Sequence, residues 1–282
     1  MRLATIGKLL VLISVIFFTG CATYTSVREH SALDSVAKNI QTVVIAPPQV
    51  NIELRVFTGE NEPLTDKENT IREQLITVAQ SRLKSEGLEV IDFDFAQAIA
   101  NDDDFAFALT QAKEALNKAE KDLYNGKSVA LENKRQFNVS LGPAVNEIAE
   151  QTGAEAVLLI DYYGFEKSAG LKTKDIAAGV LFAVLLGGSS AAIAPPSGSF
   201  VDLALVDTAS GDILWTNRRG GQIVDTSIAE HALNELPDVV WEGEVVADET
   251  AEFIEKTDIE NAAYQEEATT NDTEVALPSD AS

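Results

Sequence analysis

The stretch EIAEQTGAEAVLLIDYY, residues 147–163, decides the fold class because it joins a helix to a strand through a single glycine. Apolar residues recur at helical spacing between Gly142-Pro143 and Gly153, and a glycine is the residue that most readily ends a helix in the left-handed conformation. The apolar run Ala154–Tyr163 predicts a long strand directly afterwards. This change of pattern within a few residues is typical of a layered α/β domain.

A β-hairpin is predicted further along the chain. Phe200–Val206 and Asp212–Asn217 are apolar runs joined by Thr208-Ala209-Ser210-Gly211, which fits a type I turn with its glycine in the left-handed position. The sequence Ser-Ile-Ala-Glu at 227–230 matches a capping box and predicts a short helix that Pro237 ends. These elements place a hairpin and a helix at the C-terminal end of the domain.

The N-terminal half alternates between strand and helix patterns. Thr65 and Glu68 match a second capping box, in which Thr65 caps the helix and Glu68 binds the cap amide. Asp102-Asp103-Asp104 suits a helix start better than a Ca²⁺ loop, because no ladder of ligands follows it. The predicted elements are a strand at 42–46, a strand or extended loop at 51–57, helix 66–86, strand 88–93 and helix 105–124. The fold class is therefore α/β, a single layered domain with a mixed sheet, a C-terminal hairpin and flanking helices.

The first 22 residues resemble a bacterial lipoprotein signal. Arg2 and Lys8 precede the apolar run Leu9–Phe18, which is too short to span a bilayer, and the single cysteine of the chain, Cys21, follows Thr19-Gly20. The resemblance implies a signal peptide at 1–20, acylation of Cys21 with chains such as palmitate, and a tether at 21–41. Ala22 after the cysteine, in place of aspartate, implies the outer membrane, with the domain on the periplasmic side.

The charge of the chain restricts its partners. The net charge of −24 excludes nucleic acid and anionic lipid headgroups as electrostatic ligands and favours basic partners. From Glu242 onward there are thirteen acidic residues and one base, Lys256. We therefore expect an α/β domain at 42–237, including a helical stretch at 95–140, and an acidic, largely disordered tail at 238–282.

An apolar segment at 174–199 allows three interpretations. Residues 176–194 carry no charge, but Gly187-Gly188-Ser189-Ser190 interrupts them, which disfavours a transmembrane helix. A membrane-inserting hairpin of an oligomeric pore is the second interpretation, although pore strands alternate apolar and polar residues. The favoured interpretation is a helix at 175–186 and a loop, packed on the sheet or in a subunit interface.

The sequence offers little that would support catalysis. The two histidines are His30, in the expected tether, and His231, whose neighbours Asp225 and Ser227 are explained by helix capping. No metal-ligand or cofactor motif is present in the sequence. We therefore expect that the protein binds no metal or cofactor and is not an enzyme. Arg218, Arg219 and Trp241 are the candidate partner contacts. The two arginines end the hairpin and suit an acidic partner or the chain's own tail, with a solvated strand end as the favoured alternative. Trp241, at the entry to the tail, suits an anchor for a partner or a contact that pins the tail to the domain.

Two segments carry a resemblance to known families. Glu147–Leu159 and the hairpin Leu205–Asn217, with its Val-Asp, Gly and Trp positions, resemble the TolB amino-terminal type of α/β domain. This fold recurs in curli-export pore lipoproteins and penicillin-binding-protein activator lipoproteins, and the resemblance spans roughly residues 42–236. It implies a fold and an envelope compartment. The chain is thus predicted to be a lipid-anchored, non-catalytic accessory protein that binds other envelope proteins, with its state as a monomer or a homo-oligomer left open. The alternative is a subunit of an oligomeric outer-membrane export pore.

Overall fold

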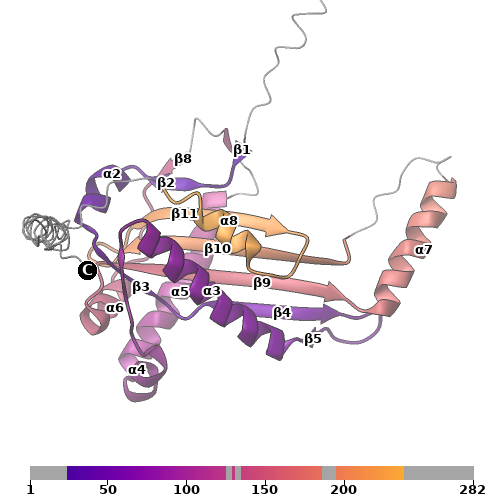
Figure 1. Ribbon diagram of the computed structural model, residues 1–282, viewed down its shortest axis with the longest axis horizontal. Coiled ribbons are helices and arrows are strands. Elements are labelled where there is room, and N and C mark those ends of the chain that lie inside the picture. The colour runs from indigo at the N-terminus through magenta and orange to yellow at the C-terminus, as the bar shows by residue number, and fades with distance from the viewer. Residues whose placement is uncertain (1–23, 125–128, 131–134, 186–194, 238–282) are drawn as a thin grey trace, which may run out of the picture. The chain divides into compact units, whose positions relative to one another are not determined.

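The domain is built on one mixed sheet, which a computed structural model describes over residues 24–124, 129–130, 135–185 and 195–237 (Figure 1). The three longest strands, β9, β10 and β11, pair antiparallel and form its centre. Strand β2 pairs antiparallel with β11 and parallel with β8, whereas β3 and β4 both pair parallel with β9. The strands are β2 (Arg28–His30), β3 (Thr42–Ile45), β4 (Gln49–Arg55), β5 (Glu62–Pro63), β6 (Glu89–Ile91), β8 (Arg135–Phe137), β9 (Ala156–Lys167), β10 (Ser197–Asp207) and β11 (Ile213–Gly221). The predicted mixed α/β class is confirmed.

Strands β3 and β4 lie end to end along β9. Val43 pairs with Ala156 in β3, and Gln49 pairs with Asp161 in β4, so the two strands follow successive halves of the same neighbour. Pro47-Pro48 separates them, because proline cannot donate a ladder hydrogen bond. The outer edges are covered by β6 beside β3 and by β5 beside β4. This arrangement makes β9 the strand around which the sheet is organised.

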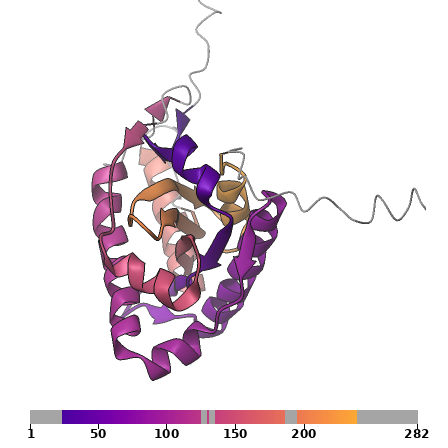
Figure 2. The same cartoon turned by 90° about the vertical axis from the view of Figure 1, so that its left-hand side faces the viewer.

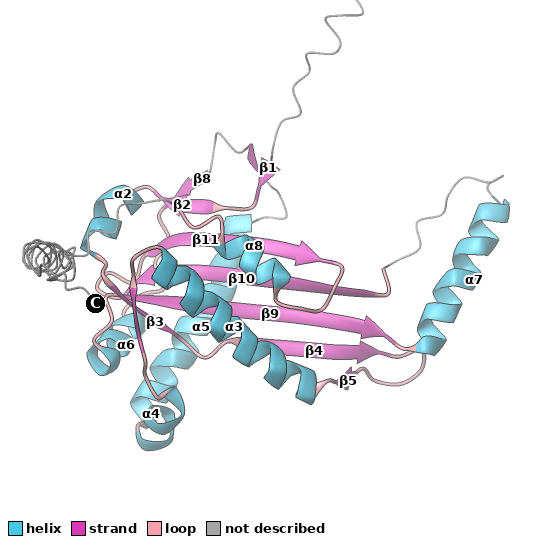
Figure 3. Cartoon of the chain, viewed as in Figure 1, coloured by secondary structure: helices cyan, strands magenta, loops and turns pink. Residues whose placement is uncertain are grey.

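Helices α3 (Thr65–Ser85), α8 (Ser227–Leu233) and α2 (Leu33–Val36) contribute to the core on one face of the sheet, and α3 and α8 lie across that face (Figures 1 and 3). The apolar stripe of α3 predicted from the sequence is buried, and the side chains of β9 alternate between the two faces. The buried α3 residues are Ile71, Leu75, Ala79 and Leu83.

The opposite face is covered by α4 (Phe95–Asn101), α5 (Asp103–Tyr124) and α6 (Ala144–Thr152), which Figure 2 separates from α3. Asp102 accepts a hydrogen bond from the amide of Phe105 at 3.0 Å, which confirms the helix-start interpretation of the aspartate run. Gly153 ends α6 at φ +72°. Gly211 closes the β10–β11 hairpin at φ +77°. Both glycines thus occupy the left-handed region that the sequence predicted for them.

The tether prediction was wrong for residues 24–40, which belong to the domain. Strand β1 (Tyr24–Thr25) pairs with β7 (Val129–Ala130), and β2 extends the sheet beyond β11. The short turn η1 (Ala37–Asn39) follows α2. Widely spaced apolar residues of this segment fill the end of the core. Their spacing has no helical or strand period, so the sequence pattern did not indicate that they are buried. The buried residues are Val27, Leu33, Ala37 and Ile40. Residue Cys21 and the tail at 238–282 lie outside the described residues.

Neither capping box forms. The residue before α3 is Leu64, and Glu68 accepts the amide of Ile52 at 2.9 Å, so this carboxylate fastens the helix to β4 instead of capping its own first turn. In α8, Ser227 donates its hydroxyl to Asp225 at 2.6 Å. A tertiary or neighbouring acceptor has replaced the local capping bond in both places.

Helix α7 (Ala169–Leu185) stands beyond the ends of the strands and does not lie on a face of the sheet (Figures 1 and 3). Its start is fixed by Lys167, which pairs with Asp175 at 2.5 Å, and by the amide of Ser168, which donates to the carbonyl of Arg55. Ile176 is 53% exposed. The prediction of a helix packed on its own sheet is therefore wrong for the part of α7 whose side chains are described, and the subunit-interface interpretation stays a prediction. In the described part of the chain, no helix has the length and hydropathy needed to cross a membrane.

Candidate functional site

The candidate site lies on the α5 side of the sheet, where strand register brings polar residues from distant parts of the sequence into rows. Gln49, Asp161, Asp202 and Arg218 are successive register partners on β4, β9, β10 and β11. Side chains in one such row point to the same face of the sheet. Helix α5 crosses the sheet at this row, since Glu120 reaches Arg218.

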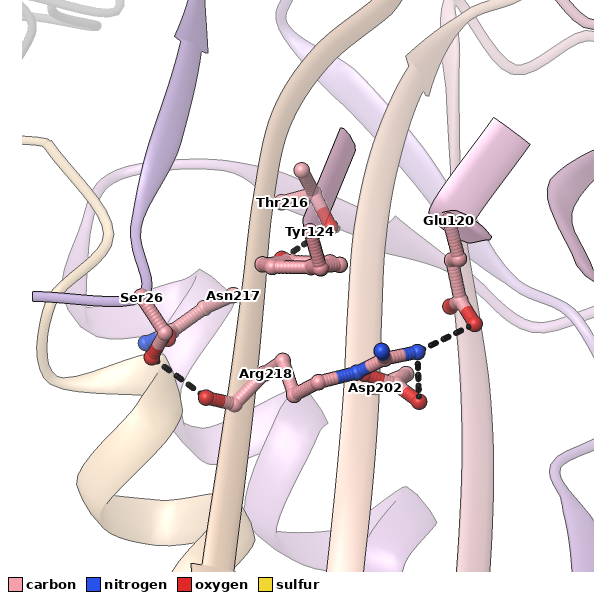
Figure 4. A network of polar contacts seen from close by, with 7 residues as sticks. All are labelled: Ser26, Glu120, Tyr124, Asp202, Thr216, Asn217 and Arg218. Atoms are coloured by element: carbon pink, nitrogen blue, oxygen red, sulfur yellow. Dashed lines mark hydrogen bonds and ion pairs between the residues drawn. The ribbon is translucent and has the colours of Figure 1, made fainter. Parts of the chain in front are cut away.

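Arg218 is the centre of the polar network drawn in Figure 4. Its Nε and Nη2 atoms donate to the two carboxylate oxygens of Asp202 at 2.5 and 2.9 Å, and Nη2 also donates to Glu120 at 2.9 Å. The guanidinium lies 4.5 Å from the ring centre of Tyr124, and the Tyr124 hydroxyl is 3.0 Å from that of Thr216. Paired in this way, one cation holds together two strands and the last turns of α5.

The network holds more carboxyl groups than its cations offset. Burial, followed by the nearby charge of Asp202, raises the pKa of Glu120 to about 8, although the charge of Arg218 acts to lower it. Burial also raises the pKa of Asp161 on β9. Burial lowers the pKa of Lys113, which lies on α5 as Glu120 does. Glu120 is therefore protonated at neutral pH, and its Oε2 still accepts the Arg218 hydrogen bond as a neutral carboxyl oxygen.

A second row of register partners lies closer to the end of the sheet from which α7 extends. Asn51, Tyr163, Phe200 and Gly220 are register partners across the same four strands. Phe200 is 50% exposed, and its ring lies against Gly220, where an added Cβ would come within 3.0 Å of the ring. A glycine opposite an aromatic lets the ring lie flat on the sheet. This row is therefore an open aromatic surface beyond the reach of α5.

The polar groups beside the aromatic row are fixed to one another. Tyr163 donates its hydroxyl to Glu53, and Arg55 donates to Tyr163 at 2.8 Å and to Glu53 at 2.9 Å. The Arg55 guanidinium lies 3.9 Å from the ring centre of Phe165. The hydrogen bond from Tyr163, followed by that from Arg55, lowers the pKa of Glu53. The result is a preorganised surface of aromatic rings and paired charges, which is suited to binding.

The structure finds other places for the residues considered for chemistry. His30 accepts the amide of Ala32 through Nδ1 at 3.1 Å, and His231 lies exposed on α8. Asp225 accepts both the amide and the hydroxyl of Ser227. Within the ranges that the structure describes, no group of three or more histidine, cysteine, aspartate or glutamate residues is placed to hold a metal ion.

Of the predicted partner contacts, the structure describes Arg218 and Arg219; Trp241 and the predicted lipidation site, Cys21, lie outside the described residues. Both arginines are half-exposed and already paired within the chain, Arg218 as above and Arg219 with Glu235 of the segment after α8. Their use by a partner stays a prediction. Sequence reasoning missed the rows themselves, although one signal was present. Asp161 and Asp202 each interrupt an apolar strand at a position that faces the same side.

The class of protein that these features define is a mixed α/β domain with helices on both sheet faces and a partly open face that carries an aromatic and polar surface. No family model matches the chain, and no curated protein sequence matches it.

The solved structures to which this chain is similar include three with low sequence identity. The lipoprotein GNA1162 from Neisseria meningitidis is 11% identical, with 83% of this chain and 99% of that chain covered and a TM-score of 0.28. The dodecamer of a single-residue variant of PelC from Paraburkholderia phytofirmans is 12% identical, with 78% and 99% covered and a TM-score of 0.30. The C-terminal domain of LpoB from Salmonella enterica is 12% identical, with 68% and 96% covered and a TM-score of 0.22. At these TM-scores the similarity assigns this chain no activity and no partner.

Proposed function

We propose that this chain is a lipid-anchored, non-catalytic interaction protein of the bacterial envelope, held on the periplasmic side of the outer membrane by acyl chains on Cys21. The observation that carries the binding role is the open row of Tyr163 and Phe200, flanked by the Glu53–Arg55 pair. A surface whose polar groups are already bonded to one another loses little entropy on binding, and exposed aromatics are frequent anchors of interfaces.

The charges favour a basic partner. The chain carries a net charge of −24, so a partner of opposite charge is attracted to it. Complementary charge mainly speeds association and selects among partners, so added salt should slow the binding of such a partner.

The anchoring half of the proposal is tested by following the wild-type chain and Cys21→Ser through cell fractionation with labelled palmitate. We expect the wild type to carry the label in the outer-membrane fraction and Cys21→Ser to be unlabelled and released into the periplasm. A wild-type chain without label, or one retained in the cytoplasm, would contradict the anchoring.

The binding half is tested in cells with a photo-crosslinking amino acid placed at Phe200 or, as a control, at Phe107. Phe107 is 61% exposed but lies on α5, away from the open row. We expect adducts with envelope proteins from position 200 and few from position 107. Equal yields from the two positions would show that the open row has no special role.

A second candidate function, a subunit of an oligomeric export pore, rests on α7. This helix stands clear of both layers of helices, as an element that contacts other subunits or a membrane would. A pore subunit should form a discrete ring of many chains that requires detergent even when Cys21 is replaced. A soluble monomer or dimer of Cys21→Ser would exclude this candidate.

A further inference from the structure

The connection between the predicted lipid anchor and the folded domain is very short. Strand β1 begins at Tyr24, three residues after Cys21, and pairs with β7. An extended chain gains no more than about 3.6 Å per residue, so Tyr24 lies within about 11 Å of the anchoring residue. The tether expected at 21–41 would have reached about 70 Å. Acyl chains on Cys21 would thus hold the domain at the membrane surface itself.

The residues that follow the anchor are fixed to the body of the domain. The Ser26 hydroxyl lies 3.0 Å from the side-chain oxygen of Asn217 on β11 (Figure 4). Arg28 is 1% exposed and donates to the carbonyl of Val27 at 2.8 Å. The Arg28 guanidinium also lies 5.3 Å from the ring centre of Tyr124 on α5. A segment that is buried and bonded in this way does not fray, so β1 and β2 transmit the position of the anchor to the whole domain.

The anchored segment lies at one edge of the sheet. Strand β8 forms that edge and pairs with β2, β1 lies beside them, and β4 and β5 form the opposite edge (Figure 1). Neighbouring strands are about 4.8 Å apart, so the five steps from β2 to β5 span about 24 Å. The short connection therefore holds the β2–β8 edge close to the membrane. The β5 edge can approach the membrane only if the whole sheet lies flat on it.

The charges of the two edges differ in a way that favours one orientation. Strands β1, β2, β7 and β8 together contain two arginines and one acidic residue, Glu29. The whole chain has a net charge of −24, so acidic residues are concentrated elsewhere. Glu60 and Glu62, at the β5 edge, are exposed. An anionic lipid surface repels such groups, and the β2–β8 edge is therefore the one that it tolerates best.

We propose that the β2–β8 edge, together with the β1–β7 pair, lies against the phospholipid headgroups of the membrane in which Cys21 is anchored. This orientation depends on the acylation of Cys21 proposed above, and the short connection sets it. Phe200 on β10 is two strands from β2, and the separation of these strands is about 10 Å. A protein that binds the open row therefore does so close to the membrane surface.

The test measures fluorescence quenching by lipid headgroups in the acylated full-length chain. Acylation occupies the only cysteine of the chain, so a cysteine introduced elsewhere is the only thiol that a maleimide dye can label. One preparation carries Ser31→Cys, directly after β2, and another carries Glu62→Cys, on β5; both residues are exposed. Each is reconstituted into vesicles of phosphatidylethanolamine and phosphatidylglycerol that contain a lipid with a nitroxide on its headgroup.

We expect the dye at position 31 to be quenched at least about fivefold more than the dye at position 62, because a nitroxide quenches only near contact and the two strands are about 24 Å apart. Equal quenching at the two positions would overturn the proposal, since it would mean that the domain tumbles or lies flat. Stronger quenching at position 62 would overturn it as well.

A longer connection provides the matched control. Insertion of about 20 glycine and serine residues after Thr23 keeps the anchor and the domain but adds a flexible segment with a mean span of about 25 Å. We expect this variant to lose the excess of quenching at position 31. If the excess persists, the short connection does not set the orientation, and the proposal is wrong.

Flotation with the vesicles separates this proposal from the anchoring on which it depends. A chain that carries no palmitate label and does not float contradicts both the anchoring and the orientation. A chain that is labelled, floats and is quenched equally at both positions contradicts the orientation only. The anchoring and the binding of envelope proteins would then stand, because the fractionation and photo-crosslinking experiments measure them separately.

Discussion

Replacing Glu120 by glutamine should reduce the loss of folding stability as pH rises. Glu120 is 5% exposed, and burial raises the pKa of its carboxyl group to about 8 from the ordinary 4.5. Between these values the folded chain holds a proton that the unfolded chain has released. Stability therefore falls as pH rises through this window, and below about 4.5 the penalty is absent.

The size of the effect follows from the width of the window. Each pH unit between the two pKa values costs about 1.4 kcal/mol, so the wild type should lose about 3 kcal/mol between pH 5 and pH 7 through this group. Glu120→Gln removes the titration while its amide oxygen can still accept from Arg218. Between pH 5 and pH 7, the free energy of unfolding of the variant should thus rise by about 3 kcal/mol relative to that of the wild type.

Urea unfolding at pH 5, 6 and 7 measures this difference in the Cys21→Ser background. The matched control is Glu114→Gln, because Glu114 lies on the same helix and is more exposed than Glu120. If Glu120→Gln and the wild type lose stability in parallel as pH rises, Glu120 does not hold a proton in the folded state and the reasoning fails.

Three further substitutions test the packing that supports the site, each by urea unfolding. Leu83→Ala removes a fully buried side chain of α3 and should cost about 2–5 kcal/mol; a cost near zero would contradict the burial. Glu68→Ala should cost about 1 kcal/mol more than Glu68→Gln, because only glutamine keeps an acceptor for the Ile52 amide, and equal costs would exclude that bond. Gly211→Ala should cost more than about 1 kcal/mol, since φ is +77° and the new Cβ would lie 2.5 Å from the carbonyl oxygen of Gly142; an unchanged midpoint would show that the turn relaxes.

The elements that the sequence predicted best are those set by local physics. Gly153 and Gly211 have few residue types that can replace them at positive φ, so their positions marked a helix end and a hairpin turn without any tertiary information. The stripe along α3 was equally clear, because burial of one face imposes a period on every turn.

The features that the sequence did not predict depend on contacts between distant segments. Residues 24–40 have no regular period, so only the structure shows that Val27 and Ile40 are in the core. Glu68 matched a capping box, but the amide of Ile52 competed for it. The row of Asp161, Asp202 and Arg218 requires the register of three strands, and the raised pKa of Glu120 requires the crossing of α5 over that row. Local patterns contain none of this information.

The most direct test of the central claim, that this chain binds envelope proteins through the open row of Tyr163 and Phe200, is photo-crosslinking in cells with the probe placed at Phe200, compared with the same probe at Phe107. Both side chains are exposed, so neither change should unfold the domain. We predict adducts with envelope proteins from position 200 and few from position 107. Equal yields from the two positions would contradict the account.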